Sequence, residues 1–301
     1  MRKKVDRRLA GEVLAELLPG AAPAATELLL KDLHLLTRDG DLNADARRKL
    51  KQIRHLLQLL GPAVDDALAR HADPIVVDCG AGKSYLGFLL YLTRLAPAGR
   101  GRLLSIEARP ELVAATAERA ARFGCDRLTA VGGAIAHAPL PERVHVVTAL
   151  HACDTATDEA VARAVTAGAD WVAVVPCCQA EVARQLAERG PREPALAALC
   201  AHPWHRRELG SHLTNVVRAL ALEAHGYQVT VTELTGWEHS LKNELILARR
   251  VKRFDRAAQG RLDELVDRFG VAPALVRALP PASGAAPPAP PDPSGGTAQT
   301  S

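Results

Sequence analysis

An acidic residue and two closely spaced glycines follow a short apolar run near residue 75. Residues 75–77 are β-branched, Asp78 comes next, and Gly80 and Gly82 flank a single alanine. Glycine permits a sharp turn and close approach to a ligand, and a helix after the turn directs its free N–H groups at that ligand. The Asp78 carboxylate suits a ligand with a cationic ammonium group and would repel a pyrophosphate. The stretch 75–87 therefore predicts a strand, a tight turn and a helix around a bound cofactor.

Two better-known glycine-rich turns do not fit this spacing. A phosphate-binding P-loop needs a glycine five positions before Gly82, where Val77 stands. A dinucleotide-binding turn needs a glycine at the position of Tyr85 and has no acid before its first glycine. The remaining pattern resembles motif I of the class I S-adenosylmethionine methyltransferases, and a tight turn without a ligand is the alternative. The resemblance assigns four loop residues to binding of S-adenosyl-L-methionine: Asp78, Gly80, Gly82 and Ser84.

A second acid lies at the distance that a nucleoside-binding fold requires. Glu107 ends the predicted strand 102–106, 20 residues after Gly87. In a βαβ nucleotide fold, an acid at this point accepts hydrogen bonds from two ribose hydroxyls. A solvated acid at a strand end is the alternative. The loop after the third predicted strand, 128–131, has no acid for an adenine amino group, so we expect Ile135 and backbone groups to form the adenine pocket.

Polar clusters follow the fourth and fifth predicted strands, 144–150 and Trp171–Val175. In an open parallel sheet, ligands bind beyond the carboxyl ends of the strands, so both clusters are predicted to line the acceptor crevice. Methyl transfer needs an aligned nucleophile, exclusion of water and, for some acceptors, a base. The candidate catalytic residues are His151, Cys153, Asp154 and Cys177.

Several roles remain open for these residues. His151 or Asp154 would serve as the base, with a structural histidine and an N-cap of the helix near Thr157 as alternatives. Cys153 with Cys177 or Cys178 would add to a pyrimidine ring as thiolates. A zinc site is the third possibility, although adjacent cysteines lack the spacing of structural zinc motifs; its ligands would be His151, Cys153, Cys177, Cys178 and His239. The simplest interpretation is a pocket lined by small, half-buried residues.

Three segments together resemble a known family. They are the turn 78–87, the Leu-His-Ala-Cys-Asp segment 150–154 and the Pro-Cys-Cys segment 176–178. They resemble the methyltransferase-domain family that includes human methyltransferase-like protein twenty-five and bacterial members. That family commonly has glycine where Ser84 and Asp154 stand here. The resemblance covers about residues 45–250 and implies methyl transfer, with RNA or protein as the acceptor.

Composition and charge are compatible with a nucleic-acid partner without requiring one. The 301 residues carry a net charge of +4, and the six cysteines form no evenly spaced framework, which is typical of a reducing compartment. No apolar run reaches transmembrane length and no signal peptide is recognisable, so we expect a cytoplasmic protein. Basic residues cluster on one predicted helix and in a predicted loop at 202–207. The candidate RNA contacts are Arg47, Arg48, Lys49, Lys51, Arg54, Arg206 and Arg207.

The predicted fold is α/β, a Rossmann-like seven-stranded class I methyltransferase sheet with a helical N-terminal extension. We expect a helical cap at 1–72, the S-adenosylmethionine-binding domain at 73–250, C-terminal helices at 251–280 and a disordered tail at 281–301. The predicted function is methyl transfer to RNA, with rRNA or tRNA as the acceptor. A protein methyltransferase, a non-catalytic domain that keeps the fold, and a nicotinamide-dependent oxidoreductase are the alternatives. The oligomeric state is not predicted.

Overall fold

The fold was analysed in a computed structural model of the chain. The structure describes residues 23–33, 36, 44–150, 152, 154–176, 179–191, 193–234 and 244–280, with the backbone alone at 23–25, 44–51 and 53. The first 22 residues of the predicted helical cap and the predicted tail at 281–301 lie outside these ranges. No helix in the described ranges combines the length and apolar character needed to cross a bilayer.

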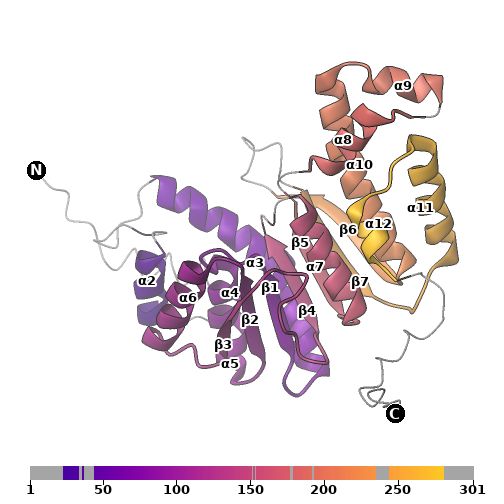
Figure 1. Cartoon of the computed structure of the whole chain (residues 1–301). Helices are drawn as coiled ribbons and strands as arrows, with labels where there is room; N and C mark the ends of the chain where they lie inside the picture. The colour runs from indigo at the N-terminus through magenta and orange to yellow at the C-terminus, as the bar shows by residue number, and fades with distance from the viewer. Residues whose placement is uncertain are drawn as a thin grey trace, which may run out of the picture.

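A seven-stranded sheet forms the centre of the molecule (Figure 1). Its order is β3-β2-β1-β4-β5-β7-β6, and neighbours in the β3 to β5 part are parallel. β7 runs antiparallel to both β5 and β6. The strands are β1 Ile75–Cys79, β2 Arg102–Glu107, β3 Leu128–Gly132, β4 Val146–Leu150, β5 Trp171–Val175, β6 Tyr227–Glu233 and β7 Glu244–Arg250.

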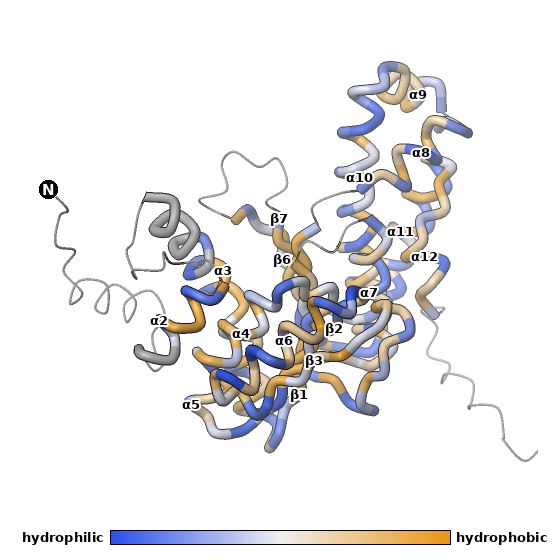
Figure 2. Tube along the Cα trace, turned by 60° about the vertical axis from the view of Figure 1, so that its left-hand side comes forward, coloured by the Kyte–Doolittle hydropathy of each residue, from blue (hydrophilic) through white to orange (hydrophobic). Residues whose placement is uncertain are grey.

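Helices cover both faces of the sheet because alternate strand residues point to opposite sides. Val76 packs into one buried cluster with Leu60 of the N-terminal helices and Phe88. Val77 packs into the other cluster, together with Val161 and Val217 of later helices. The apolar colour of Figure 2 accordingly concentrates along α3, α4 and the strands. The predicted N-terminal cap thus shares a hydrophobic core with the sheet.

The helices follow the predicted alternation with strands. Those on the first face are α2 Pro23–Asp32, α3 Ala44–Arg70, α4 Tyr85–Leu90, the π-helix η1 Tyr91–Leu95, α5 Ala96–Ala98 and α6 Pro110–Arg122. The later ones are α7 Thr155–Thr166, α8 Glu181–Glu188, α9 Pro194–Cys200, α10 Pro203–Ala224, α11 Arg256–Phe269 and α12 Ala274–Ala278. Helices α11 and α12 lie within the segment 251–280, for which C-terminal helices are predicted.

The predicted basic loop at 202–207 is wrong, because those residues begin helix α10. His202 is the N-cap, and its ring nitrogen accepts a hydrogen bond from the backbone N–H of Trp204 at 3.3 Å. Pro203 occupies the first helical position, where its fixed φ suits a helix and its missing N–H costs nothing. Residues 194–200 also form a helix, α9, where only an apolar stretch was predicted.

Helices α8 and α10 cross at a glycine. A Cβ on Gly210 would lie 2.7 Å from the Cα of Ala183, closer than real side chains approach. The glycine therefore lets the two helix backbones pack directly against each other. In Figures 1 and 2, α8, α9 and the first part of α10 project beyond the sheet.

Candidate functional site

The glycine-rich turn has the left-handed backbone that its residues predict. Gly80 and Gly82 have φ values of 65° and 57°, and Ser84 has φ 57° as well. For glycine this region is free of strain, whereas for serine it is uncommon. Ser84 stands where the motif that this turn resembles has glycine. Its backbone nevertheless adopts the left-handed conformation that is typical of glycine.

Ser84 is held in this conformation by its buried side chain. Its hydroxyl hydrogen-bonds the hydroxyl of Ser105 on β2, and both serines are buried. A Cβ on Gly87 would lie 2.5 Å from the Ser84 hydroxyl, so Gly87 leaves the room that the serine needs. The pair Ser84 and Ser105 joins the turn to the second strand.

Glu107 lies against the glycine turn, as its spacing predicts. Its Oε2 accepts the backbone N–H of Gly82 at 2.8 Å, and its Oε1 accepts the backbone N–H of Arg109 at 3.1 Å. The Arg109 guanidinium contacts both oxygens, with Nε 2.9 Å from Oε1 and Nη2 3.4 Å from Oε2. Burial raises the pKa of Glu107, but the hydrogen bonds from Arg109 and Gly82 outweigh it and hold the pKa below its ordinary value. Glu107 is therefore an ionised acceptor beside the turn.

Asp78 is buried below the turn. Its Oδ1 accepts the hydroxyl of Thr148 at 2.8 Å, and the backbone N–H of Gly87 also bonds to its carboxylate. Burial raises the pKa of Asp78 to about 7, against the lowering effect of both hydrogen bonds. Asp78 therefore links β1 to β4 and to the helix that follows the turn. Its predicted contact with a cofactor ammonium stays a prediction.

Ile135 closes the other side of the turn. The buried Ile135 side chain has its Cδ1 3.6 Å from the position of a Cβ on Gly80, and the Cβ of Ala152 lies at the same distance. The third-strand loop and the fourth-strand loop thus meet over Gly80. The structure brings together the glycine turn, Glu107 and Ile135, all of them predicted from the sequence as cofactor-binding residues.

Arg109 contacts the carboxylate of Glu107, which is predicted to bind a ribose. A carboxylate has about four lone-pair positions, and four N–H groups already contact that of Glu107. The Arg109 side chain is 62% exposed, so it is free to turn into solvent when hydroxyl groups take its place. Sequence spacing did not identify this contact, although an arginine two residues after the acid was visible.

We expect Arg109→Ala to strengthen binding of S-adenosylmethionine about 2–5-fold, because a weak, exposed ion pair no longer competes for the Glu107 carboxylate. Titration calorimetry at low salt measures the change. Arg122→Ala is the matched control, since Arg122 is exposed on the same helix and pairs with Asp32 instead. Weaker binding in Arg109→Ala would show that the guanidinium assists the ligand and does not compete with it.

Asp154 bonds the N-terminus of the next helix. Its Oδ1 accepts the backbone N–H groups of Ala180 at 3.0 Å and Glu181 at 3.3 Å, and its Oδ2 lies 3.3 Å from Arg184 Nη2. It occupies the N-cap position of α7, as the alternative interpretation predicts, but its side chain makes no cap hydrogen bond to that helix. The reason is the backbone, whose φ of 50° and ψ of −120° turn the side chain toward α8.

These contacts count against Asp154 as a general base. Burial raises the pKa of Asp154, but the hydrogen bonds from Ala180, Glu181 and Arg184 outweigh it and keep the pKa below its ordinary value. A carboxylate with a lowered pKa accepts a proton less readily. Its predicted catalytic role stays a prediction, while its contact with α8 is a feature of the fold.

A buried polar network lies behind the acceptor loops. The fully buried Arg218 on α10 donates to Asp158 Oδ1 at 2.7 Å, to Asn215 Oδ1 at 3.1 Å and to the carbonyl of Asp154 at 2.9 Å. Asn215 also accepts from Gln179 at 3.1 Å and donates to Glu244 Oε2 at 2.8 Å. The network joins the ends of β4 and β5 to α10 and to the start of β7. Sequence reasoning missed it, because Arg218 looked like an ordinary charged helix residue.

The remaining predicted residues are only partly visible. His151, Cys153, Cys177, Cys178 and His239 lie outside the described residues, as do the side chains of Arg47, Arg48, Lys49 and Lys51. The thiolate, zinc and base interpretations therefore stay predictions. Of the candidate RNA contacts, Arg54, Arg206 and Arg207 have described side chains. Arg206 and Arg207 lie together on the first turns of α10.

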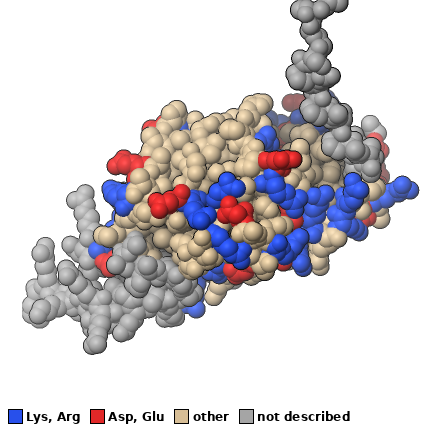
Figure 3. Space-filling view, turned by 90° about the horizontal axis from the view of Figure 1, so that it is seen from below, with Lys and Arg blue, Asp and Glu red and all other residues tan. Residues whose placement is uncertain are grey.

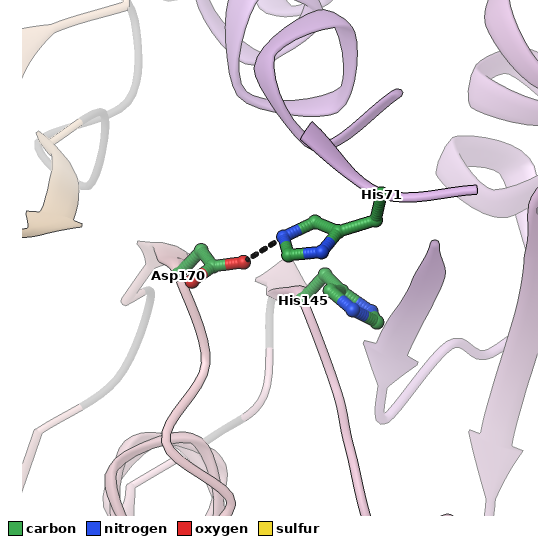
Figure 4. Close-up of side chains that lie close together, drawn as sticks. All are labelled: His71, His145 and Asp170. Carbon is green, nitrogen blue, oxygen red and sulfur yellow. Dashed lines mark hydrogen bonds and ion pairs between the residues drawn. The ribbon is translucent and has the colours of Figure 1, made fainter. Parts of the chain in front are cut away.

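A histidine pair and an aspartate meet at the opposite, amino edge of the sheet (Figure 4). The Nε2 of His71 lies 2.8 Å from Asp170 Oδ2, and the rings of His71 and His145 are 4.1 Å apart. Within the described part of the chain, this is a group whose atoms lie close enough to hold a metal ion.

Its hydrogen bonds favour a structural role. The backbone N–H of Ile75 donates to His145 Nδ1 at 2.9 Å, which places the proton of the neutral ring on Nε2 and leaves no lone pair for a metal. Asp170 also pairs with Arg143 at 3.0 Å and Arg70 at 3.5 Å. Figure 3 views this underside of the molecule, where basic and acidic side chains are interspersed. The cluster therefore ties the strand starts to α3.

Comparison with known proteins bears on the sheet and its turn. Residues 48–185 match a methyltransferase domain family. The match includes every predicted cofactor-binding residue described above, from Asp78 through Glu107 to Ile135. With the strand order, it confirms the predicted Rossmann-like, seven-stranded class I methyltransferase fold.

Solved structures similar to this chain include three methyltransferases. An rRNA methylase from Streptococcus thermophilus has 9% identity and a TM-score of 0.43, covering 64% of this chain and 95% of its own. A putative rRNA methylase from Clostridium thermocellum has 13% identity and a TM-score of 0.42, covering 64% and 96%. An SAH-bound methyltransferase from Podospora anserina has 14% identity and a TM-score of 0.41, covering 84% and 99%. No curated protein matches the sequence.

Proposed function

We propose that this chain is an S-adenosylmethionine-dependent methyltransferase that acts on RNA. The observation that supports S-adenosylmethionine as the methyl donor is the contact of the Glu107 carboxylate with the Gly82 N–H, beside the left-handed glycine turn. In this assignment Glu107 binds the ribose hydroxyls, Ile135 contacts the adenine, and Gly80 and Gly82 let the backbone approach the methionine end. When bound, the cofactor supplies a methyl group already activated on a sulfonium.

The chain's own contribution is alignment and exclusion of water. Methyl transfer from a sulfonium is an in-line displacement, so positioning accounts for much of the rate. Ala152 and Ile135 cover the turn with apolar surface. The buried network around Arg218 holds the fourth-strand loop, from which His151, Cys153 and Asp154 are candidates to contact the acceptor. The narrower grouping with human methyltransferase-like protein twenty-five stays a prediction.

We expect donor affinity to rise with pH between about pH 5.5 and 7 if Asp78 binds the cofactor ammonium. The carboxyl has a pKa of about 7, so below that pH it is protonated and must lose its proton before it attracts a cation. Affinity then falls by up to about tenfold for each pH unit below 7. Calorimetry with wild type and Asp78→Asn measures the effect, and the asparagine variant should bind weakly without this dependence. A pH-independent wild-type affinity would exclude the direct contact.

RNA is preferred as the acceptor because of the arginines on α10 and the basic face predicted for α3. The deciding experiment incubates purified protein and radiolabelled S-adenosylmethionine with RNA and with protein from a strain that lacks the gene. Label in RNA supports the proposal, whereas label in protein alone selects the alternative acceptor.

A non-catalytic domain is the second candidate. It is favoured by the Glu107 carboxylate, whose hydrogen-bonding positions are already filled by N–H groups of Gly82 and Arg109. Calorimetry separates the two: absence of donor binding at any salt concentration would favour the non-catalytic domain. Binding of NAD in preference to S-adenosylmethionine would instead select an oxidoreductase.

A further inference from the structure

A groove lies between helices α8 and α10, next to the loops of the predicted acceptor crevice. It has a volume of about 420 Å³ and is lined by Gln179, Ala180, Ala183, Arg184, Ala187, Pro203, Arg206 and Arg207. The groove forms because the two helices touch at Gly210 and Ala183 and diverge on either side of that crossing. One helical turn away from that crossing, Ala187 on α8 and Arg206 on α10 face the gap that opens between the helices.

The groove presents three guanidinium groups from two helices. Arg184 and Arg207 have side chains 59% exposed. Their acidic partners are Asp154, 3.3 Å from Arg184, and Glu208, 3.2 Å from Arg207. Arg206 donates one N–H to the carbonyl of Cys200 at 3.2 Å. A guanidinium has five N–H donors, so each arginine keeps donors for a ligand, and exposed ion pairs are weak competitors.

An exposed aromatic residue stands beside these arginines. Trp204 is 53% exposed, and the Arg207 guanidinium lies 4.3 Å from its ring centroid. Guanidinium groups match phosphate oxygens in pairs, and an exposed aromatic ring offers a stacking surface to any unpaired base. The small side chains of Ala180, Ala183 and Ala187 leave room for a sugar-phosphate backbone.

One end of the groove reaches the acceptor loops. Gln179 follows β5 and is fixed by Ser211, whose hydroxyl donates to it at 2.9 Å, and by Asn215. Arg184 contacts Asp154 in the loop after β4. A nucleic-acid chain bound in the groove therefore runs toward the carboxyl edge of the sheet, where Gly80 and Glu107 lie.

We propose that the groove between α8 and α10 binds single-stranded RNA, with Arg184, Arg206 and Arg207 on its phosphates and Trp204 on an unpaired base. The proposal rests on the function proposed above, because it supplies the acceptor route for that methyl-donor site. It extends that function by naming the strandedness of the RNA and the residues that hold it. An acidic peptide and duplex RNA are the competing ligands.

The test uses the full chain and fluorescein-labelled, mixed-sequence RNA of about 12 nucleotides, within the length that one such groove spans. Fluorescence anisotropy is recorded from about 50 to 200 mM salt. We expect the triple variant Arg184→Ala, Arg206→Ala, Arg207→Ala to bind at least about tenfold more weakly, and its log–log salt slope to fall by about 2. Arg102→Ala is the control, since Arg102 is 53% exposed and pairs with Asp73 at the opposite edge. It should change affinity less than about twofold.

The aromatic contact has its own variants. Trp204→Ala should weaken RNA binding at least about fivefold, and Trp204→Phe should restore most of it, because phenylalanine keeps a stacking face. Equal loss in both variants, or none in either, would exclude base stacking. Thermal denaturation of each variant verifies that the helices remain folded.

Two further ligands decide the class of the partner. A labelled oligoglutamate that binds as tightly as RNA, through the same arginines, would overturn the RNA assignment. A duplex of the same length that binds better than the single strand would overturn the single-strand assignment.

Donor binding separates this proposal from the function that it rests on. Calorimetry with S-adenosylmethionine should give equal affinities for wild type and the groove variants. RNA binding that is absent, or unaffected by the triple variant, would refute the groove even where the donor binds. Absence of donor binding, with RNA still held by the arginines, would refute the methyltransferase and leave the groove standing.

Discussion

Glu107→Ala should reduce the affinity for S-adenosylmethionine about 100-fold. Each hydrogen bond to a charged acceptor contributes about 1.5–3 kcal/mol, and the variant removes the acceptor of two ribose hydroxyls. It also removes the partner of the Gly82 N–H and so loosens the turn. Titration calorimetry measures the loss.

Two variants make the Glu107 result specific. Glu107→Gln keeps a neutral acceptor in the same place and should lose only about tenfold. Glu111→Ala removes an exposed acid from the first turn of α6, the helix that follows Glu107, and should bind S-adenosylmethionine like wild type. Wild-type affinity in Glu107→Ala would remove the main support for a donor site at this turn.

Arg218→Met should lower the free energy of unfolding by about 3–5 kcal/mol, because it leaves the buried carboxylate of Asp158 without its partner. Burial raises the pKa of Asp158 even beside Arg218, and without the guanidinium the carboxyl holds its proton more strongly. The folded state then binds more protons than the unfolded state above the ordinary pKa, so stability falls as pH rises. Urea denaturation near pH 4 and pH 8 should show the larger deficit at pH 8.

The matched control for Arg218 lies on the facing helix. Arg261 on α11 pairs with Glu223 of α10 at 2.7 Å, but its side chain is 60% exposed. Arg261→Met should cost less than about 1 kcal/mol. The double variant Asp158→Asn, Arg218→Met should recover part of the loss, since no buried charge remains unpaired. A similar loss in the free energy of unfolding for Arg218→Met and Arg261→Met would show that the buried ion pair of Arg218 stabilises the fold no more than an exposed pair does.

The grouping of the predicted cofactor-binding residues was predictable because it depends on a short-range sequence pattern. The acid, the two glycines and the strand spacing to Glu107 lie within about thirty residues, and the periodic strands around them set the sheet order. Trp171–Val175 was predicted with its observed bounds. The cofactor-side residues meet because parallel neighbours bring their carboxyl ends to one edge.

The acceptor side was less predictable because its contacts join distant segments. Asp154 bonds the start of α8, and Arg218 reaches back 60 residues to Asp158. A single sequence gives no signal for such pairs. The first turns of α10 were missed for a local reason: residues 202–207 were predicted as a basic loop, although proline at position 203 is favoured at the first position of a helix.

The backbone of Asp154 has an evolutionary consequence. A non-glycine residue at φ 50° and ψ −120° stores about 1–3 kcal/mol of strain, which its carboxylate offsets by bonding the N-terminus of α8 and Arg184. Glycine at position 154 would release the backbone strain but would lose the hydrogen bonds to the N-terminus of α8. Substitutions at the two positions are therefore expected to be coupled: a lineage that loses Arg184 gains by replacing Asp154 with glycine, and one that keeps the aspartate selects for a basic residue on the facing turn of α8.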